Sequence, residues 1–99
     1  MATTSRTYML TFTYVPEMLE RREPYRAEHL ARLGKARDAG FLIMAGAVAD
    51  PVDGALLLVQ AEGPGEVLAW AADDPYARAG LLRGVTVREV NVAVARWLT

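Results

Sequence analysis

The sequence contains no cysteine and only one histidine, His29. Without cysteine there is no disulfide bond, no thiol nucleophile and no zinc site with sulfur ligands. One histidine does not make a histidine-rich metal site, and no spacing of carboxylates indicates a mixed one. We therefore predict a protein that uses no metal and no other cofactor.

Net charge is nearly absent as well. The chain has 11 basic and 12 acidic residues, so its formal net charge is −1. A nucleic-acid-binding surface needs a basic face that neutralises phosphates, and an electrostatic membrane anchor needs a polybasic segment. No apolar run reaches the ~20 residues of a membrane span, and the first residues lack the apolar stretch of a secretory signal. We expect a cytoplasmic protein without nucleic-acid or membrane partners.

Familiar catalytic motifs are also missing. The sequence contains neither G-x-x-x-x-G-K-[ST] nor G-x-G-x-x-G, so the common phosphate-cradling loops are not expected. It has no G-x-S-x-G segment to carry a serine nucleophile. The predicted third strand, Ala55–Ala61, offers no aromatic side chain on which an RNA base could stack.

The periodicity that is present is typical of a small α+β domain. The 99 residues, 53% of them hydrophobic, fit one domain at 7–99 behind a short flexible lead-in at 1–6. Apolar alternation and the helical period predict the elements. The predicted strands are Tyr8–Val15, Phe41–Ala49, Ala55–Ala61 and Val85–Trp97. The predicted helices are Pro24–Ala39, with a buried stripe at Leu30 and Leu33, then Glu66–Ala72 and a short turn from Asp74 to Ala79.

This order is the ferredoxin-like βαββαβ arrangement, in which two helices cover one face of a four-stranded antiparallel sheet. The other face should be polar where it meets water. Leu56, Leu57 and Leu58 instead place apolar side chains on both faces of one strand. A second copy of the sheet is the simplest cover, so we predict a homodimer; the alternative is a mixed surface with scattered apolar residues. In the last strand, a change of phase near Arg88 and Glu89 predicts a β-bulge.

His29 is the centre of the candidate chemistry. It lies beside the predicted stripe of Leu30 and Leu33, and Arg26 lies one helical turn earlier. A histidine can exchange a proton near neutral pH, and an arginine can hold a carboxylate by two parallel hydrogen bonds. A half-exposed histidine beside a solvated arginine fits the same pattern, and for an isolated pair it is the more common case.

Asp74 and Gly46 are two further candidate site positions. Asp74 before Pro75 has the pattern of a helix N-cap followed by proline in the first turn. Capping alone explains this aspartate, but one carboxylate oxygen could cap while the other orients a histidine. Gly46 interrupts the second predicted strand, where glycine marks either a bulge or the close approach of a ligand.

Three segments of the chain together resemble the YCII-like (YciI-like) family. They are Arg26-x-x-His29-Leu30-x-x-Leu33, Ala45-Gly46 and Trp70-Ala71-x-x-Asp74-Pro75-Tyr76. The resemblance implies ferredoxin-like subunits that form a dimeric α+β barrel, with a pocket beside the first helix. It also implies a catalytic dyad of His29 and Asp74, with Arg26, Gly46 and Tyr76 as substrate-binding residues.

Two functions fit the residues and the resemblance. The first is a cofactor-independent enzyme of lyase, isomerase or dehalogenase type, acting on a small, aromatic or ring-derived acid. His29 is then the acid–base group, and Asp74 orients it. The second is a non-catalytic dimer that binds or senses such an anionic small molecule. The sequence departs from the family pattern at Ala47, where proline is common, and at Leu81–Gly84, so the substrate is not specified.

Overall fold

The computed structural model describes residues 5–97. The strands in this range are β1 (Arg6–Tyr14), β2 (Leu42–Ala47), β3 (Gly54–Ala61) and β4 (Leu82–Val90). The helices in this range are α1 (Met18–Arg21), α2 (Glu23–Asp38), α3 (Pro64–Ala72) and α4 (Pro75–Arg78). Residues 1–4 of the predicted lead-in lie outside the described part. Arg6, the last residue of that lead-in, already belongs to β1 and pairs with Ala61.

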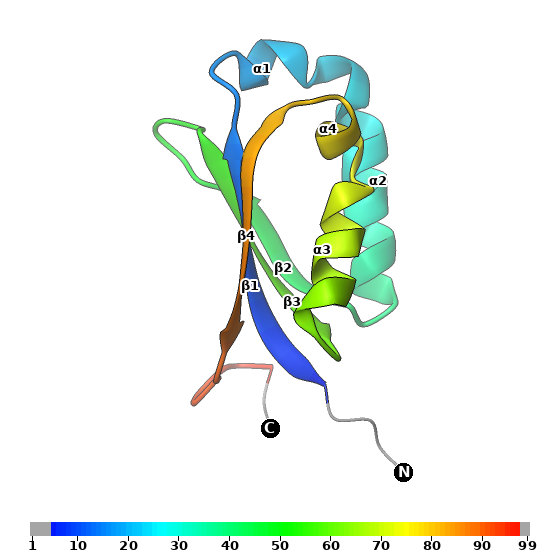
Figure 1. Cartoon of the computed structure of the whole chain (residues 1–99), viewed down its shortest axis with the longest axis vertical. Helices are drawn as coiled ribbons and strands as arrows, with labels where there is room; N and C mark the ends of the chain where they lie inside the picture. The colour runs from blue at the N-terminus through cyan, green and yellow to red at the C-terminus, as the bar shows by residue number, and fades with distance from the viewer. Residues whose placement is uncertain (1–4, 98–99) are drawn as a thin grey trace.

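The strands form one antiparallel sheet in the order β2-β3-β1-β4. Figure 1 shows α2 and α3 over the same face of this sheet, with α1 and α4 near one end of it. The element order and this strand order together are those of the ferredoxin-like fold. The predicted fold class is therefore confirmed for the subunit.

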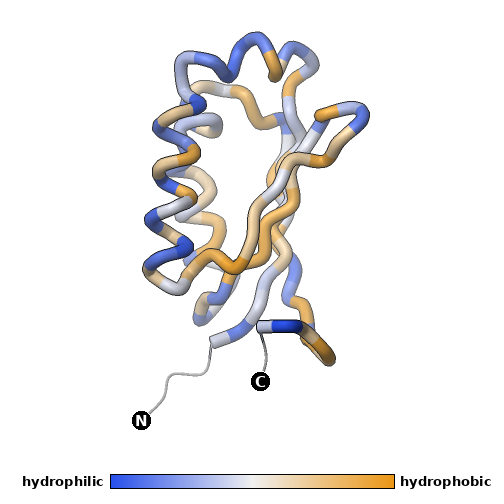
Figure 2. The backbone as a smooth tube through the Cα atoms, turned by 180° about the vertical axis from the view of Figure 1, so that it is seen from behind, coloured by the Kyte–Doolittle hydropathy of each residue, from blue (hydrophilic) through white to orange (hydrophobic). Residues whose placement is uncertain are grey.

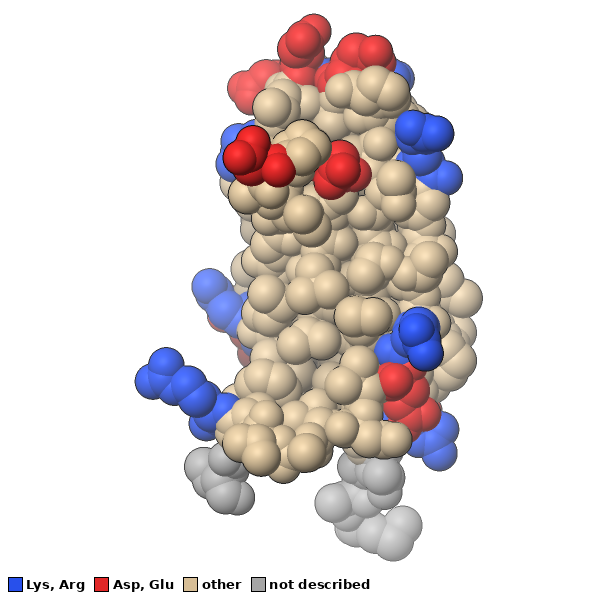
Figure 3. Space-filling view, turned by 90° about the vertical axis from the view of Figure 1, so that its left-hand side faces the viewer, with Lys and Arg blue, Asp and Glu red and all other residues tan. Residues whose placement is uncertain are grey.

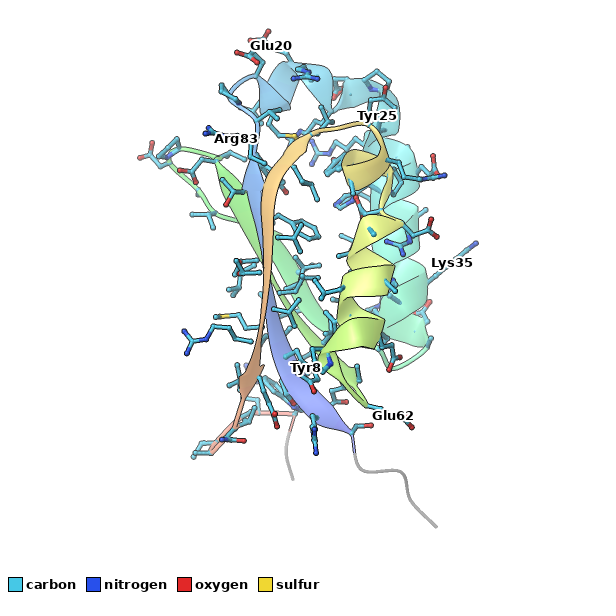
Figure 4. All side chains as sticks on the ribbon, in the orientation of Figure 1. Tyr8, Glu20, Tyr25, Lys35, Glu62 and Arg83 are labelled. Carbon is cyan, nitrogen blue, oxygen red and sulfur yellow. The ribbon has the colours of Figure 1, made fainter. Side chains whose placement is uncertain are left out.

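The hydrophobic core lies between the sheet and the helices. Tyr8, Leu10, Phe12 and Tyr14 of β1 are all buried, as their alternation predicts, and they cluster with apolar residues of the helices and the neighbouring strands. Figure 2 shows apolar stretches along the strands, whereas polar residues recur along α2. In Figure 4, Tyr8 points between the sheet and α3, and Lys35 points away from the sheet.

Strand β4 ends earlier than the sequence predicts. It spans Leu82–Val90, whereas the valine alternation predicts Val85–Trp97. Val90 lies opposite Thr7, one residue from the start of β1. The residues after Val90 therefore have no neighbouring strand whose backbone groups could pair with theirs.

The predicted bulge near Arg88 and Glu89 is also wrong. The irregularity in this pair of strands falls between Thr13 and Tyr14 of β1, where the register skips Arg83 of β4. An extra residue of this kind bends a strand, and Figure 1 shows β4 curving toward α4 at this end. The change in the valine alternation near Arg88 and Glu89 instead marks the end of the pairing between β4 and β1.

The helices differ from the prediction in two respects. Helix α1 was not expected; its Met18 is buried, and the backbone N–H of Arg22 donates to the Met18 carbonyl at 2.9 Å. On α2 the buried residues are His29 and Ala36, whereas Leu30 is 50% exposed. The buried side of α2 is the one on which His29 contacts Asp74 at the start of α4. The hydrophobic pattern of α2 alone does not predict this rotation.

Candidate active site

His29 and Asp74 are 45 residues apart in the sequence and in contact in the structure. Nδ1 of His29, on α2, lies 2.9 Å from Oδ1 and 3.0 Å from Oδ2 of Asp74. The histidine is 7% exposed and the aspartate 0%, so the half-exposed histidine that the sequence also allowed is excluded. An ionised carboxylate only accepts hydrogen bonds, so in the neutral imidazole this contact places the proton on Nδ1 and leaves the Nε2 lone pair for another partner.

Local helix geometry holds Asp74 in place. It is the N-cap of α4, with an extended backbone (φ −66°, ψ 140°), and its Oδ2 accepts the backbone N–H of Tyr76 at 2.9 Å. Pro75 follows in the first turn, where its missing N–H costs nothing. The N-cap predicted from the sequence is present. The same carboxylate also meets the histidine, because its two oxygens offer several acceptor sites.

Arg32 is a further partner of Asp74 that the sequence analysis did not single out. Its Nη1 lies 3.5 Å from Oδ1 of Asp74, and its Nη2 donates to the carbonyl of Trp70 at 2.6 Å. The guanidinium also lies over the Trp70 ring, 4.4 Å from its centroid. The spacing of three residues between His29 and Arg32, which makes them neighbours on a helix, was the available signal.

Aromatic rings restrict the orientation of the imidazole. The Tyr76 ring stacks on His29 with 3.9 Å between centroids and 15° between planes. Tyr14, at the end of β1, meets Tyr76 edge-on at 6.3 Å and 88°. Aromatic pairs of these geometries contribute about 0.5–1.5 kcal/mol beyond their burial. With one face stacked and Nδ1 bonded, the imidazole has little freedom to turn.

A cavity of about 130 Å³ lies between α2 and the sheet. Four of the five predicted site residues line it, namely Arg26, His29, Gly46 and Tyr76, whereas Asp74 lies behind His29. A Cβ atom at Gly46 would meet open space, so no neighbouring atom requires glycine there. The complete wall is Phe12, Tyr14, Arg22, Arg26, His29, Leu30, Leu33, Ala45, Gly46, Ala47, Ala55, Leu57 and Tyr76.

Among the wall residues that were not predicted as part of the site, Tyr14 and Arg22 have polar side chains. Nε of Arg22 is buried and has no hydrogen-bond partner among the residues that the structure describes. Arg22, Arg26 and His29 are spaced by four and three residues, which places them on one helix face. This signal was missed because the predicted helix began at Pro24, after Arg22.

Tyr14 should make the stability of the protein sensitive to alkaline pH. Burial, followed by the influence of Tyr76, raises the pKa of Tyr14 from 10.0 to about 12. Between these values the unfolded chain has lost the phenolic proton while the folded chain retains it. The free energy of unfolding therefore falls as pH rises. We expect about 2–3 kcal/mol, present in full below pH 10, to be lost by pH 12.

Urea unfolding across this pH range measures the loss, with Tyr14→Phe as the comparison. The variant should show a shallower decline, because its side chain does not ionise. Some decline should remain in Tyr14→Phe, since burial also raises the pKa of Tyr76. Equal slopes for the two proteins would contradict the prediction.

Among residues 5–97, no group of three or more His, Cys, Asp or Glu side chains is arranged to hold a metal ion. No helix in the same range is long and apolar enough to cross a membrane. The lack of a cofactor, the cytoplasmic location and the single domain at 7–99 stay predictions.

Comparison with protein families shows to which family the chain belongs. The sequence profile of the YCII-related domain matches residues 7–91. The chain belongs to the YCII-related family. The resemblance drawn from the R-x-x-H and D-P-Y segments is thereby confirmed. An uncharacterised protein of Haemophilus influenzae is 32% identical over 90 residues, which cover 82% of this chain and 92% of that protein.

Solved structures share the fold of this YCII-related protein. One is 5-chloro-2-hydroxyhydroquinone dehydrochlorinase (TftG) from Burkholderia phenoliruptrix, in complex with 2,5-dihydroxybenzoquinone. Its TM-score is 0.75 at 23% identity, covering 86% of this chain and 93% of TftG. Another, from Bacteroides thetaiotaomicron, is described as a candidate antibiotic biosynthesis monooxygenase. Its TM-score is 0.59 at 11% identity, covering 94% of this chain and 93% of that one. At these identities the likeness establishes the fold alone.

Proposed function

We propose that this YCII-related protein is a cofactor-independent enzyme that moves a proton on a small, ring-shaped acid, as a lyase, isomerase or dehalogenase. His29 is its acid–base group and Asp74 orients that group. One observation carries the proposal: Nδ1 of His29 is bonded to a buried carboxylate while the same imidazole forms part of a cavity wall. An imidazole held in this way offers Nε2 to whatever occupies the cavity.

The proposed chemistry follows from this tautomer. Nε2 takes a proton from a ring O–H, or from a C–H beside a ring carbonyl, and the electron pair stays on the ligand as a phenolate or enolate. The Asp74 carboxylate stabilises the resulting imidazolium without taking its proton. Return of the proton to another ring atom completes an isomerisation. In a dehydrohalogenation, the electron pair instead expels a halide ion, and the imidazolium then releases its proton to water.

The size and walls of the cavity support a single small ring as the ligand. Its volume of about 130 Å³ is close to the ~150 Å³ of an apolar cavity that binds benzene. Phe12 and Tyr76 give it aromatic walls, and Arg26 gives it a positive charge for an acid. The dihydroxybenzoquinone bound to TftG, which has the same fold, supports a hydroxylated six-membered ring as the substrate class.

Proton exchange with solvent tests this proposal before the substrate is known. In D₂O, the protein should catalyse replacement of ring hydrogens by deuterium in a panel of hydroxybenzoates and hydroxyquinones, followed by ¹H NMR. Exchange faster than in buffer alone supports the enzyme. Binding of these compounds without exchange or turnover of any of them would favour the alternative, a dimer that binds or senses the ligand.

The outer face of the sheet supports a homodimer as part of the same proposal. Met9, Met44 and Leu58 lie on the face away from the helices, and Leu58 is paired with both methionines across the strands. Figure 3 shows that this face is uncharged over its middle, with acidic and basic side chains around its rim. A second copy of the sheet would cover this apolar surface.

Sedimentation velocity at micromolar concentration should give a mass near twice the 10.8 kDa of one chain. Leu58→Glu should shift the protein toward the monomer, because a carboxylate buried in an apolar interface is costly. Ala31→Glu is the control, since it adds the same charge to an exposed position on α2. A wild-type protein that sediments only as a monomer would refute the dimer.

A further inference from the structure

Arg22 carries a buried donor without a hydrogen-bond partner in the described part of the chain. Its side chain forms part of the cavity wall, and its Nε has no hydrogen-bond partner within residues 5–97. Buried polar groups in proteins nearly always have a partner, supplied by protein, water or ligand. Because the Arg22 side chain also lies in the cavity wall, its guanidinium is placed to bind a group on a ligand there.

The neighbours of Arg22 make the same part of the cavity electropositive. Arg26 lies four residues further along and lines the same wall. Neither arginine forms an ion pair in the described part of the chain. Glu23, between them in the sequence, is exposed. No ion pair within residues 5–97 therefore takes up the positive charge of Arg22 and Arg26.

Tyr14 adds a neutral donor to this region. It lines the cavity and is only 5% exposed, and the positive charge of Arg22 acts on its phenol. Since burial raises the pKa of Tyr14 to about 12, the phenol keeps its proton at neutral pH. It can then donate a hydrogen bond to an anionic oxygen.

We propose that Arg22, with Arg26 and Tyr14, binds an anionic oxygen on the ring of the ligand and so makes the pocket select anionic over neutral rings. The inference rests on the function proposed for His29 and adds the residues that bind the anionic group of its substrate. Arg22 precedes His29 by seven residues, about 10 Å along the helix axis. A six-membered ring between them has its anionic substituent at Arg22 and its reacting hydrogen near Nε2.

Pairs of charged and neutral rings test the proposal by isothermal titration calorimetry. Benzoate and benzamide share one outline and differ in charge, and 4-nitrophenolate and 4-nitroaniline form the corresponding pair for an oxygen on the ring. We expect the anion of at least one pair to bind about 10- to 100-fold more tightly, as for a hydrogen bond between charged groups. The pair with the larger gain identifies the substituent as a carboxylate or a ring oxygen. No gain in either pair would overturn the proposal.

Variants assign the preference to Arg22. Arg22→Gln should remove most of the preference for the anion while leaving the affinity for the neutral ring unchanged. Arg22→Lys keeps the charge without Nε and should recover part of the preference, which also tests the site if the glutamine variant folds poorly. Arg37→Gln is the control, since Arg37 is exposed further along α2 and pairs with Asp38. If Arg22→Gln and Arg37→Gln bind the anions equally well, the proposal is wrong.

These titrations need no turnover, so they separate this inference from the proposed function. In His29→Gln the preference for the anion should persist, because Arg22 and Tyr14 are unchanged. A preference for anions without proton exchange on any ring supports the Arg22 site and refutes catalysis by His29. Proton exchange that occurs without any preference for anions supports His29 and refutes the Arg22 site.

Discussion

Replacing His29 by glutamine is expected to slow ring proton exchange by roughly 10²- to 10⁴-fold, the usual contribution of a positioned acid–base group. Glutamine is polar and can still hydrogen-bond to Asp74, but its amide does not take up a proton near neutral pH. Affinity for the ring should change little, because Arg26 and the aromatic walls remain. Deuterium exchange and calorimetric affinity, measured on the same samples, separate the two effects.

The matched control is Lys35→Gln, which introduces the same side chain on the same helix. Lys35 points away from the sheet (Figure 4), so its replacement should leave both binding and exchange as in the wild type. A His29→Gln protein that exchanges ring hydrogens at the wild-type rate would refute the role of His29 as the acid–base group.

Removing the carboxylate of Asp74 is expected to destabilise the fold strongly. Asp74→Ala takes the acceptor away from the imidazole of His29, from the backbone N–H of Tyr76 and from the neighbouring guanidinium of Arg32. Breaking a buried charged pair by removing one partner costs about 3–5 kcal/mol. That is a large part of the roughly 5–15 kcal/mol by which a small domain is stable.

Asp74→Asn separates the chemical role of this residue from its structural one. Asparagine is a good N-cap, so its Oδ1 can still accept from Tyr76. Its NH₂ group then faces His29 and donates to Nδ1, which moves the imidazole proton to Nε2 and removes the lone pair from the cavity. The same change in a Ser-His-Asp triad lowers kcat about 10⁴-fold. We expect exchange to fall by roughly 10³- to 10⁴-fold with most of the stability retained.

Two measurements check these variants of Asp74. Urea unfolding gives the free energy of unfolding, and ¹⁵N chemical shifts of the only imidazole report which nitrogen carries the proton. Asp73 supplies the control, because it is exposed at the end of α3, and Asp73→Ala should change stability by less than about 0.5 kcal/mol. Equal stability of Asp74→Ala and Asp73→Ala would refute the stabilising role of the buried Asp74 carboxylate. Retention of the Nδ1–H tautomer and of full exchange in Asp74→Asn would refute the orienting role.

Much of the fold could be predicted because its signals are local. The alternation in β1 predicts which of its side chains are buried, and Asp74 before Pro75 predicts the start of α4. The end of β4 could not be predicted in this way. Its apolar alternation continues past Val90, but a strand ends where its neighbour ends, and that depends on the register with β1.

The site was predicted in part for the same reason. Arg26, His29 and Asp74 belong to segments whose order and spacing resemble one family, so they could be selected without a structure. Arg22 caps the same helix before the first segment begins, and Arg32 occupies a position that the family pattern leaves unspecified. They were missed because spacing on a helix shows that side chains share a face, and it does not show what that face meets.

The sequence by itself determined the fold class, the family and the identity of the candidate dyad, because all of these depend on residue type and order. Only the tertiary structure decided that His29 is buried and that its Nδ1 meets Asp74. It also decided that the Arg22 side chain lies in the cavity wall, with an Nε that has no hydrogen-bond partner among residues 5–97. These features depend on how α2 is rotated over the sheet and where α4 packs against it. That packing, between segments distant in sequence, determines which polar groups share one buried space.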